Sequence, residues 1–498
     1  MLTLYKYSSR AFIRLFLGLL LIGVTPAIQA EDVMRFPAPE FEGNYTLPET
    51  WDFMDGRGNT IVQNLTPRDG QAPLPTSQTQ QWADVGVLAI VLSLAAWFAV
   101  KRRSRRGLFW LMLFSLGYFG FYKEGCVCPI GSIQNVALSL FNSNYAAPIT
   151  VVIFFVLPLA FALFFGRVFC ASVCALGAIQ DLVIWKPIKL PRKLTIALSM
   201  IPYFYIGGAI LFAATNAGFI ICRYDPFIGF FRLNGNAPYL YLGAGFLLAG
   251  MFIARPYCRF FCPYGVLLGL MSRFARWHLA ITPTECVDCR LCETSCPFDY
   301  INKPNTGLER EERATGVRRL GYTFLLVPLL IMLSGWVGHK MAPVMARYHR
   351  IVFTAEWVTA IKADPTLMAS PETKPLWMSR GQLFAKTFLS SGMSEEQLMA
   401  EAAKIRSQMN LGGWLLGGFL GLVFALKLIN ASLIRNQKDY EVDKPTCFSC
   451  GRCCSYCPSD EMHTPNFQPG SKTLEDALAL AQPSDPEPET ASMQKGKA

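Results

Sequence analysis

Half of the sixteen cysteines in this 498-residue chain stand in two runs of identical spacing, C-x2-C-x2-C-x3-C-P. The runs are Cys286, Cys289, Cys292 and Cys296 before Pro297, and Cys447, Cys450, Cys453 and Cys457 before Pro458. In bacterial ferredoxins this spacing lets three thiolates of a short loop bind one [4Fe–4S] cluster. Zinc is the alternative, but zinc motifs do not usually join three evenly spaced cysteines to a C-x3-C-P ending. The sequence therefore predicts two [4Fe–4S] clusters.

The fourth cysteine of each run is expected to serve the other cluster, as it does in two-cluster ferredoxins. The first cluster is then predicted on Cys286, Cys289, Cys292 and Cys457. The second is predicted on Cys447, Cys450, Cys453 and Cys296. Cys454 could replace Cys453, but the regular spacing favours Cys453 and leaves Cys454 as a spare buried thiol.

Four more cysteines belong to a pattern that occurs twice in the apolar part of the chain. Residues 167–177 and 255–265 share the pattern R-x-(aromatic)-C-x3-C-x2-G. A C-x3-C step at a helix end would point two thiols the same way, about one turn apart. Thiolates suit iron–sulfur or copper(I) chemistry, and the alternative is that these thiols only pack between helices. The predicted metal site, on the cytoplasmic face, consists of Cys170, Cys174, Cys258 and Cys262.

A third cysteine group precedes the repeats and is expected at the opposite, periplasmic face. Cys126 and Cys128 stand before the first copy, and Cys222, followed by Asp225, stands before the second. These cysteines are expected to hold a metal, with Asp225 as a further ligand. The alternative is a disulfide from Cys222 to Cys126 or Cys128, because the periplasm oxidises exposed thiols.

The four histidines of the chain give a weaker signal. None follows a C-x2-C pair, so no c-type haem motif is present. His339, at the outer end of an apolar run, is a candidate haem ligand or quinone contact, and the alternative is a structural histidine at the membrane interface.

The elements that must position these cysteines are membrane helices. The chain is 52% hydrophobic and only 16% charged, which is too apolar for an ordinary soluble protein. Seven apolar runs are long enough, or nearly so, to cross a hydrocarbon core of about 30 Å. They are Trp82–Val100, Gly107–Tyr122, Ile149–Phe165, Leu194–Ala214, Tyr239–Ala254, Gly321–Val337 and Leu411–Asn430.

Positive charge beside these runs sets the expected topology. The Lys and Arg residues behind the net charge of +11 cluster in segments such as 101–106 and 186–193. We interpret these segments as cytoplasmic loops under the positive-inside rule, and not as a nucleic-acid binding surface. If successive runs cross the membrane in opposite directions from a periplasmic start, both ferredoxin motifs lie on the cytoplasmic side of a bacterial inner membrane. The expected fold class is an all-α polytopic membrane protein with about seven transmembrane helices and a split 2[4Fe–4S] ferredoxin module.

The predicted organisation follows from this topology. A capping box at Ser394 and Gln397 predicts a helix over Ser394–Met409 within the periplasmic loop. The expected segments are a signal peptide or anchor (1–30), an extended periplasmic segment (31–81), the membrane core with the cysteine repeats (82–280), ferredoxin half 1 (281–305), a connection and helix (306–337), a periplasmic loop domain (338–410), a helix (411–432), ferredoxin half 2 (433–462) and a disordered tail (463–498).

The combination of C-x3-C-P beside membrane helices, paired ferredoxin motifs and a final Cys447-Phe-Ser-Cys450-Gly-Arg-Cys453 resembles NosR-type proteins, which support nitrous oxide reductase, and the related quinol-oxidising NapH subunits. The resemblance covers residues 123–458. NosR-type proteins usually start with a periplasmic FMN-binding domain, whereas residues 31–81 are too short for one, so the flavin function is not carried over. Ala175 also stands where the family generally has proline.

The resemblance implies an electron-transfer protein of denitrification. Electrons would pass from quinol or a cytoplasmic donor through the clusters to a periplasmic reductase system or its maturation, as in a quinol dehydrogenase component. The expected partners are lipid, quinol and a periplasmic flavin, haem or copper protein. Two alternatives are a copper-handling, Cu(II)-reducing assembly factor, because thiolates stabilise Cu(I), and a redox sensor.

Overall fold

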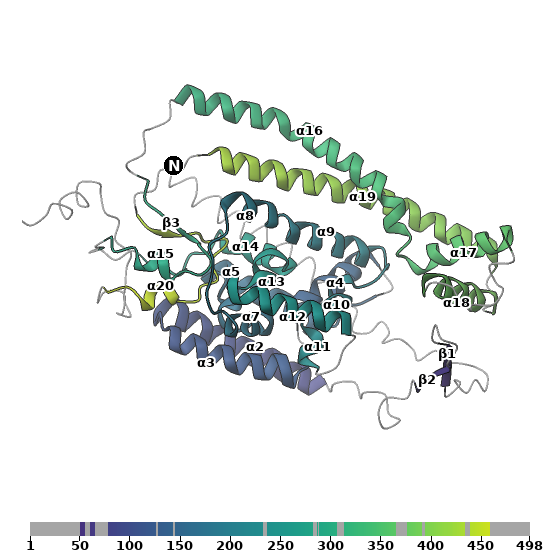
Figure 1. Ribbon diagram of the computed structural model, residues 1–498, viewed down its shortest axis with the longest axis horizontal. Coiled ribbons are helices and arrows are strands. Elements are labelled where there is room, and N and C mark those ends of the chain that lie inside the picture. Colours follow the sequence, from purple (N-terminus) through teal and green to yellow (C-terminus); the bar gives the residue numbers. More distant parts are fainter. Residues whose placement is uncertain are drawn as a thin grey trace, which may run out of the picture.

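The computed structural model describes residues 50–54, 60–64, 78–125, 128–142, 145–232, 237–281, 286, 288–305, 313–364, 376–390, 394–433 and 439–458. Within them the chain is mostly helical (Figure 1). The predicted signal segment 1–30, Cys126 and the predicted tail 463–498 lie outside the described residues. The predicted periplasmic segment contains an antiparallel pair of strands, β1 (Thr50–Met54) and β2 (Thr60–Asn64).

Four helical stretches are long and apolar enough to cross a membrane: Gln78–Lys101, Lys193–Ala214, Ala314–Ala346 and Glu395–Ser432. They consist of α2 (Gln78–Ala96) with its π-helical continuation Trp97–Lys101, α8 (Arg192–Leu198) with α9 (Ile201–Ala214), α16 (Arg313–Ala346) and α19 (Glu395–Ser432). Each contains one of the predicted apolar runs. The membrane class is therefore confirmed, and the total of seven spans stays a prediction.

The other predicted runs lie in shorter helices. They are α3 (Arg105–Ser115) with its π-helical continuation Leu116–Tyr122, α5 (Ile149–Phe165) and α12 (Ala237–Phe252). Pro158 lies inside α5 without ending it. The core between these helices and α2 is closely packed: Leu92, Ala95 and Leu108 have no exposed surface.

The cysteine repeats fold alike. In each copy an apolar helix is followed by a short helix that carries the first cysteine, α6 (Val168–Ser172) or α13 (Pro256–Phe260). The second cysteine is then the N-cap of the next helix, α7 (Ala175–Leu182) or α14 (Pro263–Ser272). The expected C-x3-C step on one helix end is therefore wrong, because the helix stops and restarts between the two cysteines.

Proline explains only part of this break. Pro263 occupies the first position of α14, where its fixed φ angle suits a helix start. Ala175 occupies the same position of α7, and the preceding Cys174 has nearly the same extended backbone conformation as Cys262. The missing proline therefore leaves the backbone of the first repeat unchanged. The remaining helices of this part are α4 (Pro129–Phe141), α10 (Ile220–Arg223) and α11 (Ile228–Phe231).

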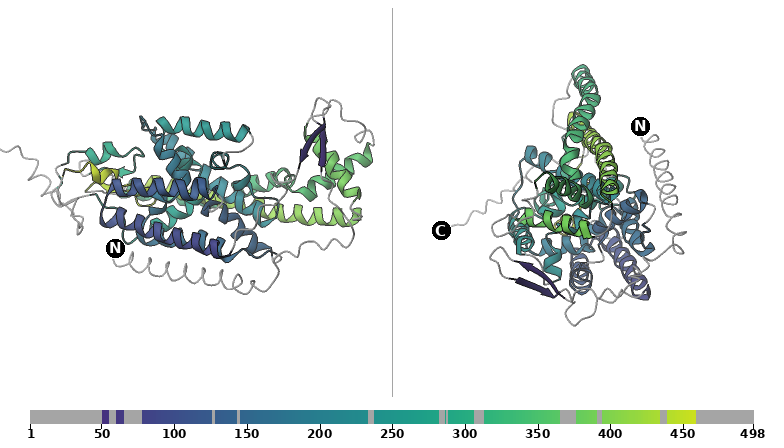
Figure 2. Two further views of the ribbon diagram at one scale, coloured as in Figure 1. Left: turned by 90° about the horizontal axis from the view of Figure 1, so that it is seen from below. Right: turned by 90° about the vertical axis from the view of Figure 1, so that its right-hand side faces the viewer.

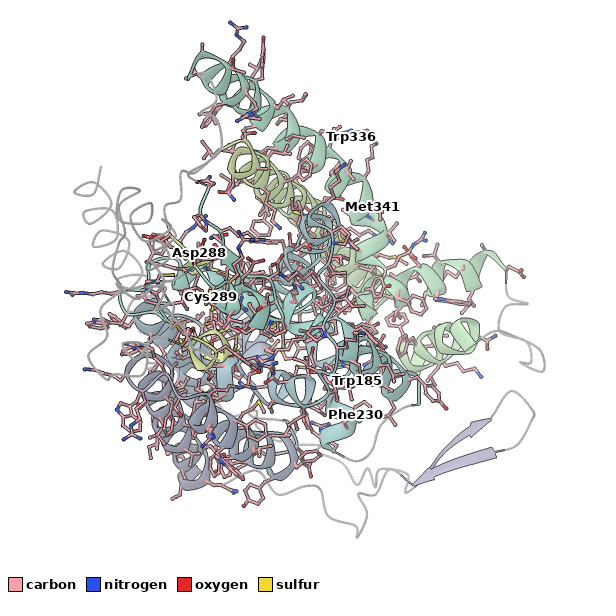
Figure 3. All side chains as sticks on the ribbon, turned by 60° about the vertical axis from the view of Figure 1, so that its left-hand side comes forward. Trp185, Phe230, Asp288, Cys289, Trp336 and Met341 are labelled. Atoms are coloured by element: carbon pink, nitrogen blue, oxygen red, sulfur yellow. The ribbon has the colours of Figure 1, made fainter. Side chains whose placement is uncertain are left out.

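The long helices α16 and α19 run side by side along one edge of the molecule (Figure 1). Small residues allow their backbones to touch, since a Cβ atom added at Gly413 would lie 2.6 Å from the carbonyl oxygen of Gly338. The outer face of α16 is apolar, and Trp336 and Met341, labelled in Figure 3, are 52% and 49% exposed. Lipid tails cover such a face in a membrane.

The predicted loop domain is helical. It consists of α17 (Arg350–Ala363), α18 (Leu376–Ser390) and the first turns of α19, which share a core around Val352, Ala402 and Met409. The predicted capping box at Ser394 and Gln397 is confirmed, with both reciprocal hydrogen bonds present. The predicted helix over Ser394–Met409 and the following membrane run form one continuous helix, because no breaker separates them.

The two ferredoxin halves meet although α16 to α19 separate them in sequence. A short antiparallel pair joins β3 (Ile301–Asn302) of the first half to β4 (Glu441–Val442) of the second. The small helices α15 (Leu291–Ser295) and α20 (Arg452–Ser455) also contact each other. This module lies at one end of the molecule, and α17, α18 and the β1–β2 pair lie at the other end (Figures 1 and 2).

Candidate iron–sulfur sites

The first predicted set of ferredoxin cysteines comes together across the two halves. Cys292 at the start of α15 is close enough to Cys286, Cys289 and Cys457 to interact electrostatically with all three. Burial, and after it the three neighbouring thiols, raise the pKa of the Cys292 thiol to about 11, against a backbone hydrogen bond from Glu293. Thiols that oppose each other's ionisation in this way need a cation, as an iron cluster supplies.

The second predicted set lines one cavity, together with Phe298, Tyr300 and Phe448. Its members are Cys296, Cys447, Cys450 and Cys453. Burial raises the pKa of the Cys447 thiol, and the Cys450 and Cys296 thiols add to the effect. Cys454 is buried beside this cavity but does not line it. The structure thus brings together the crossed sets that the spacing predicts, and their binding of iron stays a prediction.

Left-handed backbone conformations shape both ferredoxin loops. Arg290 and Gly451 are the N-caps of α15 and α20, with φ angles of 59° and 71°. Asp288 and Ser449 also have positive φ angles, of 53° and 52°. The Ser449 amide donates a hydrogen bond to the Cys447 sulfur over 3.3 Å. These turns wind the backbone around each group of thiols.

The four cysteines of the repeats, here called the core cysteines, line a second cavity, here called the core cavity. Tyr257 and Tyr264 line it as well. Cys174 interacts electrostatically with the other three members, Cys258, Cys170 and Cys262. The Gln180 amide donates a hydrogen bond to the Cys258 sulfur over 3.3 Å, and Arg167 donates one to the Cys170 sulfur over 3.8 Å. Four partly buried thiols with donors to sulfur fit a thiolate-bound iron–sulfur cofactor.

No three His, Cys, Asp or Glu side chains in the described part of the chain converge as ligands of a single metal ion. In a [4Fe–4S] cluster each thiolate binds a different iron atom, so the four sulfurs stand around a cube. The core cysteines line one cavity and the second ferredoxin set lines another, so each set surrounds a single space.

The outer cysteines are only partly described, because Cys126 lies outside the described residues. Cys128 interacts electrostatically with Asp225 and Cys222. Cys222 Sγ lies against Gly131, where an added Cβ atom would be 3.1 Å away. Cys128 forms no disulfide with another described cysteine. A metal site or a disulfide in this group remains a prediction.

Aromatic residues connect these sites. Phe298 and Phe448 pack edge to face at 4.9 Å in an apolar layer with Cys450. Cys170 and Cys258 of the core cysteines pack against this same layer. Buried Tyr257, which lines the core cavity, interacts electrostatically with both Cys262 and Cys128. The ferredoxin module, the core cavity and the outer cysteines thus form a continuous series.

Charged residues that the sequence reasoning did not single out hold this series together. Asp181 has no exposed side-chain surface and binds three arginines, Arg105 at 2.6 Å, Arg255 at 3.1 Å and Arg452 at 3.2 Å. These arginines come from α3, the second repeat and the second ferredoxin half. The repeated arginine of the R-x-(aromatic)-C pattern was the sequence signal that pointed to part of this network.

His339 stands apart from the cysteines, on α16. Its ring stacks on Trp414 of α19 with centroids 5.8 Å apart, and its Nδ1 atom has no hydrogen-bond partner among the described residues. It is therefore not brought to the iron–sulfur sites.

Comparison with known proteins agrees with this geometry. A family model described as a 4Fe–4S binding domain matches residues 147–196 and 237–282, which contain the two cysteine repeats. The fold and these sites are similar to those of ferredoxin-type iron–sulfur membrane proteins. The chain is a relative of the NosR- and NirI-type proteins of this class, which confirms the resemblance inferred from its motifs.

Three relatives illustrate the extent of the similarity. YccM of Escherichia coli (strain K12) is 28% identical over 34% of this chain and 52% of its own length. Protein NirI of Paracoccus denitrificans is 30% identical over 40% of this chain and 31% of its own length. The regulatory protein NosR of Pseudomonas aeruginosa is 26% identical over 47% of this chain and 36% of its own length. The chain thus spans about half or less of these three relatives. No solved structure matches it.

Proposed function

We propose that this chain is a membrane electron conduit with three iron–sulfur sites in series. Two [4Fe–4S] clusters bind the crossed ferredoxin sets, and a third iron–sulfur cluster binds the core cysteines. Each cluster, when bound, supplies one-electron redox chemistry. The donor is quinol or a cytoplasmic reductant, and the acceptor is a periplasmic reductase system or its maturation, which the names of the relatives suggest only by analogy.

The observation that carries the proposal is the apolar layer of Phe298 and Phe448. Cys296 and Cys450 of the second ferredoxin set and Cys170 and Cys258 of the core cysteines all touch it. Both rings are almost fully buried, at 2% and 1% exposure, so water is excluded between the two sites. Electron transfer over a short, dry and rigid gap needs little reorganisation of the surroundings. The layer therefore couples the ferredoxin module to the membrane core.

The chain's own residues hold this junction in place. Arg167 donates hydrogen bonds to the carbonyl oxygens of Pro445 and Thr446, over 3.4 and 3.3 Å. Ser272 donates to the carbonyl oxygen of Lys444 over 2.6 Å. These contacts position the Cys447 loop against the repeats. They support a fixed distance between the two sites.

The membrane arrangement supports transfer toward the other side. The ferredoxin module and the α17–α18 domain lie at opposite ends of the molecule (Figure 2). We place the module in the cytoplasm and the α17–α18 domain in the periplasm, as the positive-inside rule predicts. Tyr257 and the outer cysteines then extend the path beyond the core cavity.

Metal and sulfide analysis of the purified full-length protein tests the proposal. We expect about twelve iron atoms per chain for three [4Fe–4S] clusters. The double variant Cys258→Ser/Cys262→Ser should lose about four of them and keep the two ferredoxin clusters. Cys454→Ser is the matched control, because this buried thiol lies outside both cavities, and it should keep all the iron.

The alternatives give different results in the same experiment. About eight iron atoms, with no loss in the double variant, would refute the third cluster. Copper that disappears in the double variant would favour the copper-handling function. Bleaching of the cluster absorbance by a reduced quinol analogue in membranes would identify quinol as the donor, and bleaching only by a soluble reductant would exclude it.

A further inference from the structure

Two buried arginines occupy equivalent positions of the two repeats beside the core cavity. Arg167 and Arg255 are 6% and 0% exposed. Arg167 lines the core cavity directly. Arg255 lies behind Gly177, which lines the cavity, and a Cβ atom added there would be 3.4 Å from Arg255 Nη1. A buried charge is costly unless it is compensated, so two cations at one cavity indicate an anion nearby.

Each arginine reaches across to the glycine that ends the other repeat. Arg255 of the second copy packs on Gly177 of the first, and Arg167 of the first packs on Gly265 of the second, where an added Cβ atom would lie 3.0 Å from Nη2. Both also hold Cys170: Arg167 Nη2 donates to its sulfur over 3.8 Å, and Arg255 Nη1 donates to its carbonyl oxygen over 2.5 Å. One reciprocal arrangement thus accounts for both the repeated arginine and the repeated glycine.

Protein carboxylates do not neutralise this pair. Asp181 binds Arg255, but it also binds Arg105 and Arg452, so these four side chains keep a net positive charge. No carboxylate pairs with Arg167 in the described part of the chain, and its other partners are backbone carbonyls and the Phe448 ring, 4.7 Å away.

Polar hydrogens also remain unused around the cavity. Arg167 Nε, Arg255 Nη2 and the Tyr257 hydroxyl are buried and have no hydrogen-bond partner among the described residues. Buried donors of this kind are normally satisfied. A cluster bound by four thiolates has a net negative charge and sulfur acceptors, and it would meet both requirements.

We propose that Arg167 and Arg255 are the charge-compensating pair of the core cluster and raise its reduction potential. This inference rests on the proposed function. One electron leaves the ferredoxin cluster, which is oxidised, and enters the core cluster, which is reduced, with no bond made or broken. Because reduction adds negative charge, two fixed cations stabilise the reduced form more than the oxidised form. The arginines therefore favour transfer from the ferredoxin module into the membrane.

Redox titration of the full-length protein, followed by EPR, tests this inference. The variants are Arg167→Gln and Arg255→Gln, with Arg167→Lys and Arg255→Lys as charge-conserving partners. We expect at least a tenfold fall in the equilibrium constant for reducing the core cluster in each Gln variant, which is a shift of about 59 mV to lower potential. The Lys variants should recover part of it. Arg276→Gln, an exposed arginine stacked on Trp277, is the control and should cause no shift.

The outcomes distinguish an effect of the positive charge of the arginines from an effect of side-chain packing. If the Gln variants lose the core cluster while the Lys variants keep it, the positive charge is needed for binding, and the inference stands. If both lose it while the ferredoxin signals persist, packing alone matters, and the inference fails. Full iron content with unchanged potentials in the Gln variants also overturns it. If the unsubstituted protein contains no core cluster, the proposed function itself fails, and iron analysis detects this separately.

Discussion

Asp181 is the residue on which the junction of three parts of the chain depends. Its carboxylate accepts hydrogen bonds from Arg105 over 2.6 Å and from Arg255 over 3.1 Å. It also forms an ion pair with Arg452 at 3.2 Å. Burial by itself would raise the pKa of Asp181, but Arg255, then Arg452 and Arg105 outweigh it and hold that pKa well below its usual range. The stabilisation is therefore present above the ordinary pKa of about 3.9 and is lost only at lower pH.

Asp181→Asn should lower the free energy of unfolding by about 3–5 kcal/mol, because it leaves buried arginines without their anion. Thermal unfolding in detergent measures this change, and limited proteolysis should show the second ferredoxin half released first. Glu356→Gln is the control, because its pairs with Arg347 and Arg406 are largely exposed and contribute about 0–1 kcal/mol. Equal effects of the two substitutions would contradict the role assigned to Asp181.

His349 provides a pH-dependent cap in the α17–α18 domain. Its Nδ1 atom accepts a hydrogen bond from the Ile351 amide over 3.2 Å at the start of α17. Burial lowers the pKa of His349, and the more weakly acting Glu401 opposes this without reversing it. The folded state therefore favours the neutral imidazole, so its contribution is present above a pH of about 6.5 and is lost as the pH falls below that value.

Amide hydrogen exchange in the first turn of α17 should accelerate between pH 7.5 and pH 5.5, because a protonated imidazole cannot accept the cap hydrogen bond. His349→Asn places a capping side chain that does not titrate. This variant should keep the slow exchange at both pH values, after correction for intrinsic exchange rates. An unchanged pH dependence in the variant would show that another group is responsible.

At the scale of elements, the α16–α19 pair depends on close backbone contact. Gly413 faces the Gly338 carbonyl oxygen, and Gly421 faces the Leu330 carbonyl oxygen, each at 2.6 Å from an added Cβ atom. Interfaces of this kind between membrane helices gain stability from van der Waals packing. The pair connects the two ferredoxin halves, so its geometry also affects how those halves meet.

Gly413→Val should separate the two helices and cost about 1–3 kcal/mol, because the added atoms overlap the backbone of α16. The cost can be measured as a shift in the denaturant midpoint of helix unfolding. Gly418→Ala is the matched control, since its Cβ atom would meet only Ile331 at an ordinary 3.8 Å. A similar loss in both variants would argue against specific packing at Gly413.

At the scale of the whole molecule, the two ends are expected on opposite sides of the membrane. Lys303 in the ferredoxin module and Lys362 in α17 have side chains that are 63% and 64% exposed. In intact spheroplasts, a membrane-impermeant reagent directed at amines cannot distinguish these two lysines from the other lysines of the chain. Cysteine replacements are therefore needed.

We expect Lys362→Cys in intact spheroplasts to react with an impermeant maleimide from outside, over the labelling of the unsubstituted protein. Lys303→Cys should react only after the membrane is permeabilised, because we place the ferredoxin module in the cytoplasm. Mass spectrometry of the labelled peptides distinguishes each new thiol from native cysteines. Outside labelling of Lys303→Cys would reverse the predicted topology.

Local spacing gave the parts of the prediction that depend on local backbone geometry. The spacing of Cys286 to Cys296 and of Cys447 to Cys457 indicates two ferredoxin loops, and Ser394 with Gln397 indicates a capping box. These patterns involve residues within one or two turns of each other. Apolar runs also located the membrane helices, because each must present hydrophobic residues along its length.

Only the tertiary structure decided how the cysteine groups meet. The break between Cys170 and Cys174, the crossing of Arg255 onto Gly177 and the convergence on Asp181 join segments that no spacing rule connects. The sequence by itself determined the cysteine spacings, which predict the iron ligands, and that these cysteines lie beside apolar helices. Packing decided which thiols share a cavity, because contacts between distant segments depend on how whole helices fit together.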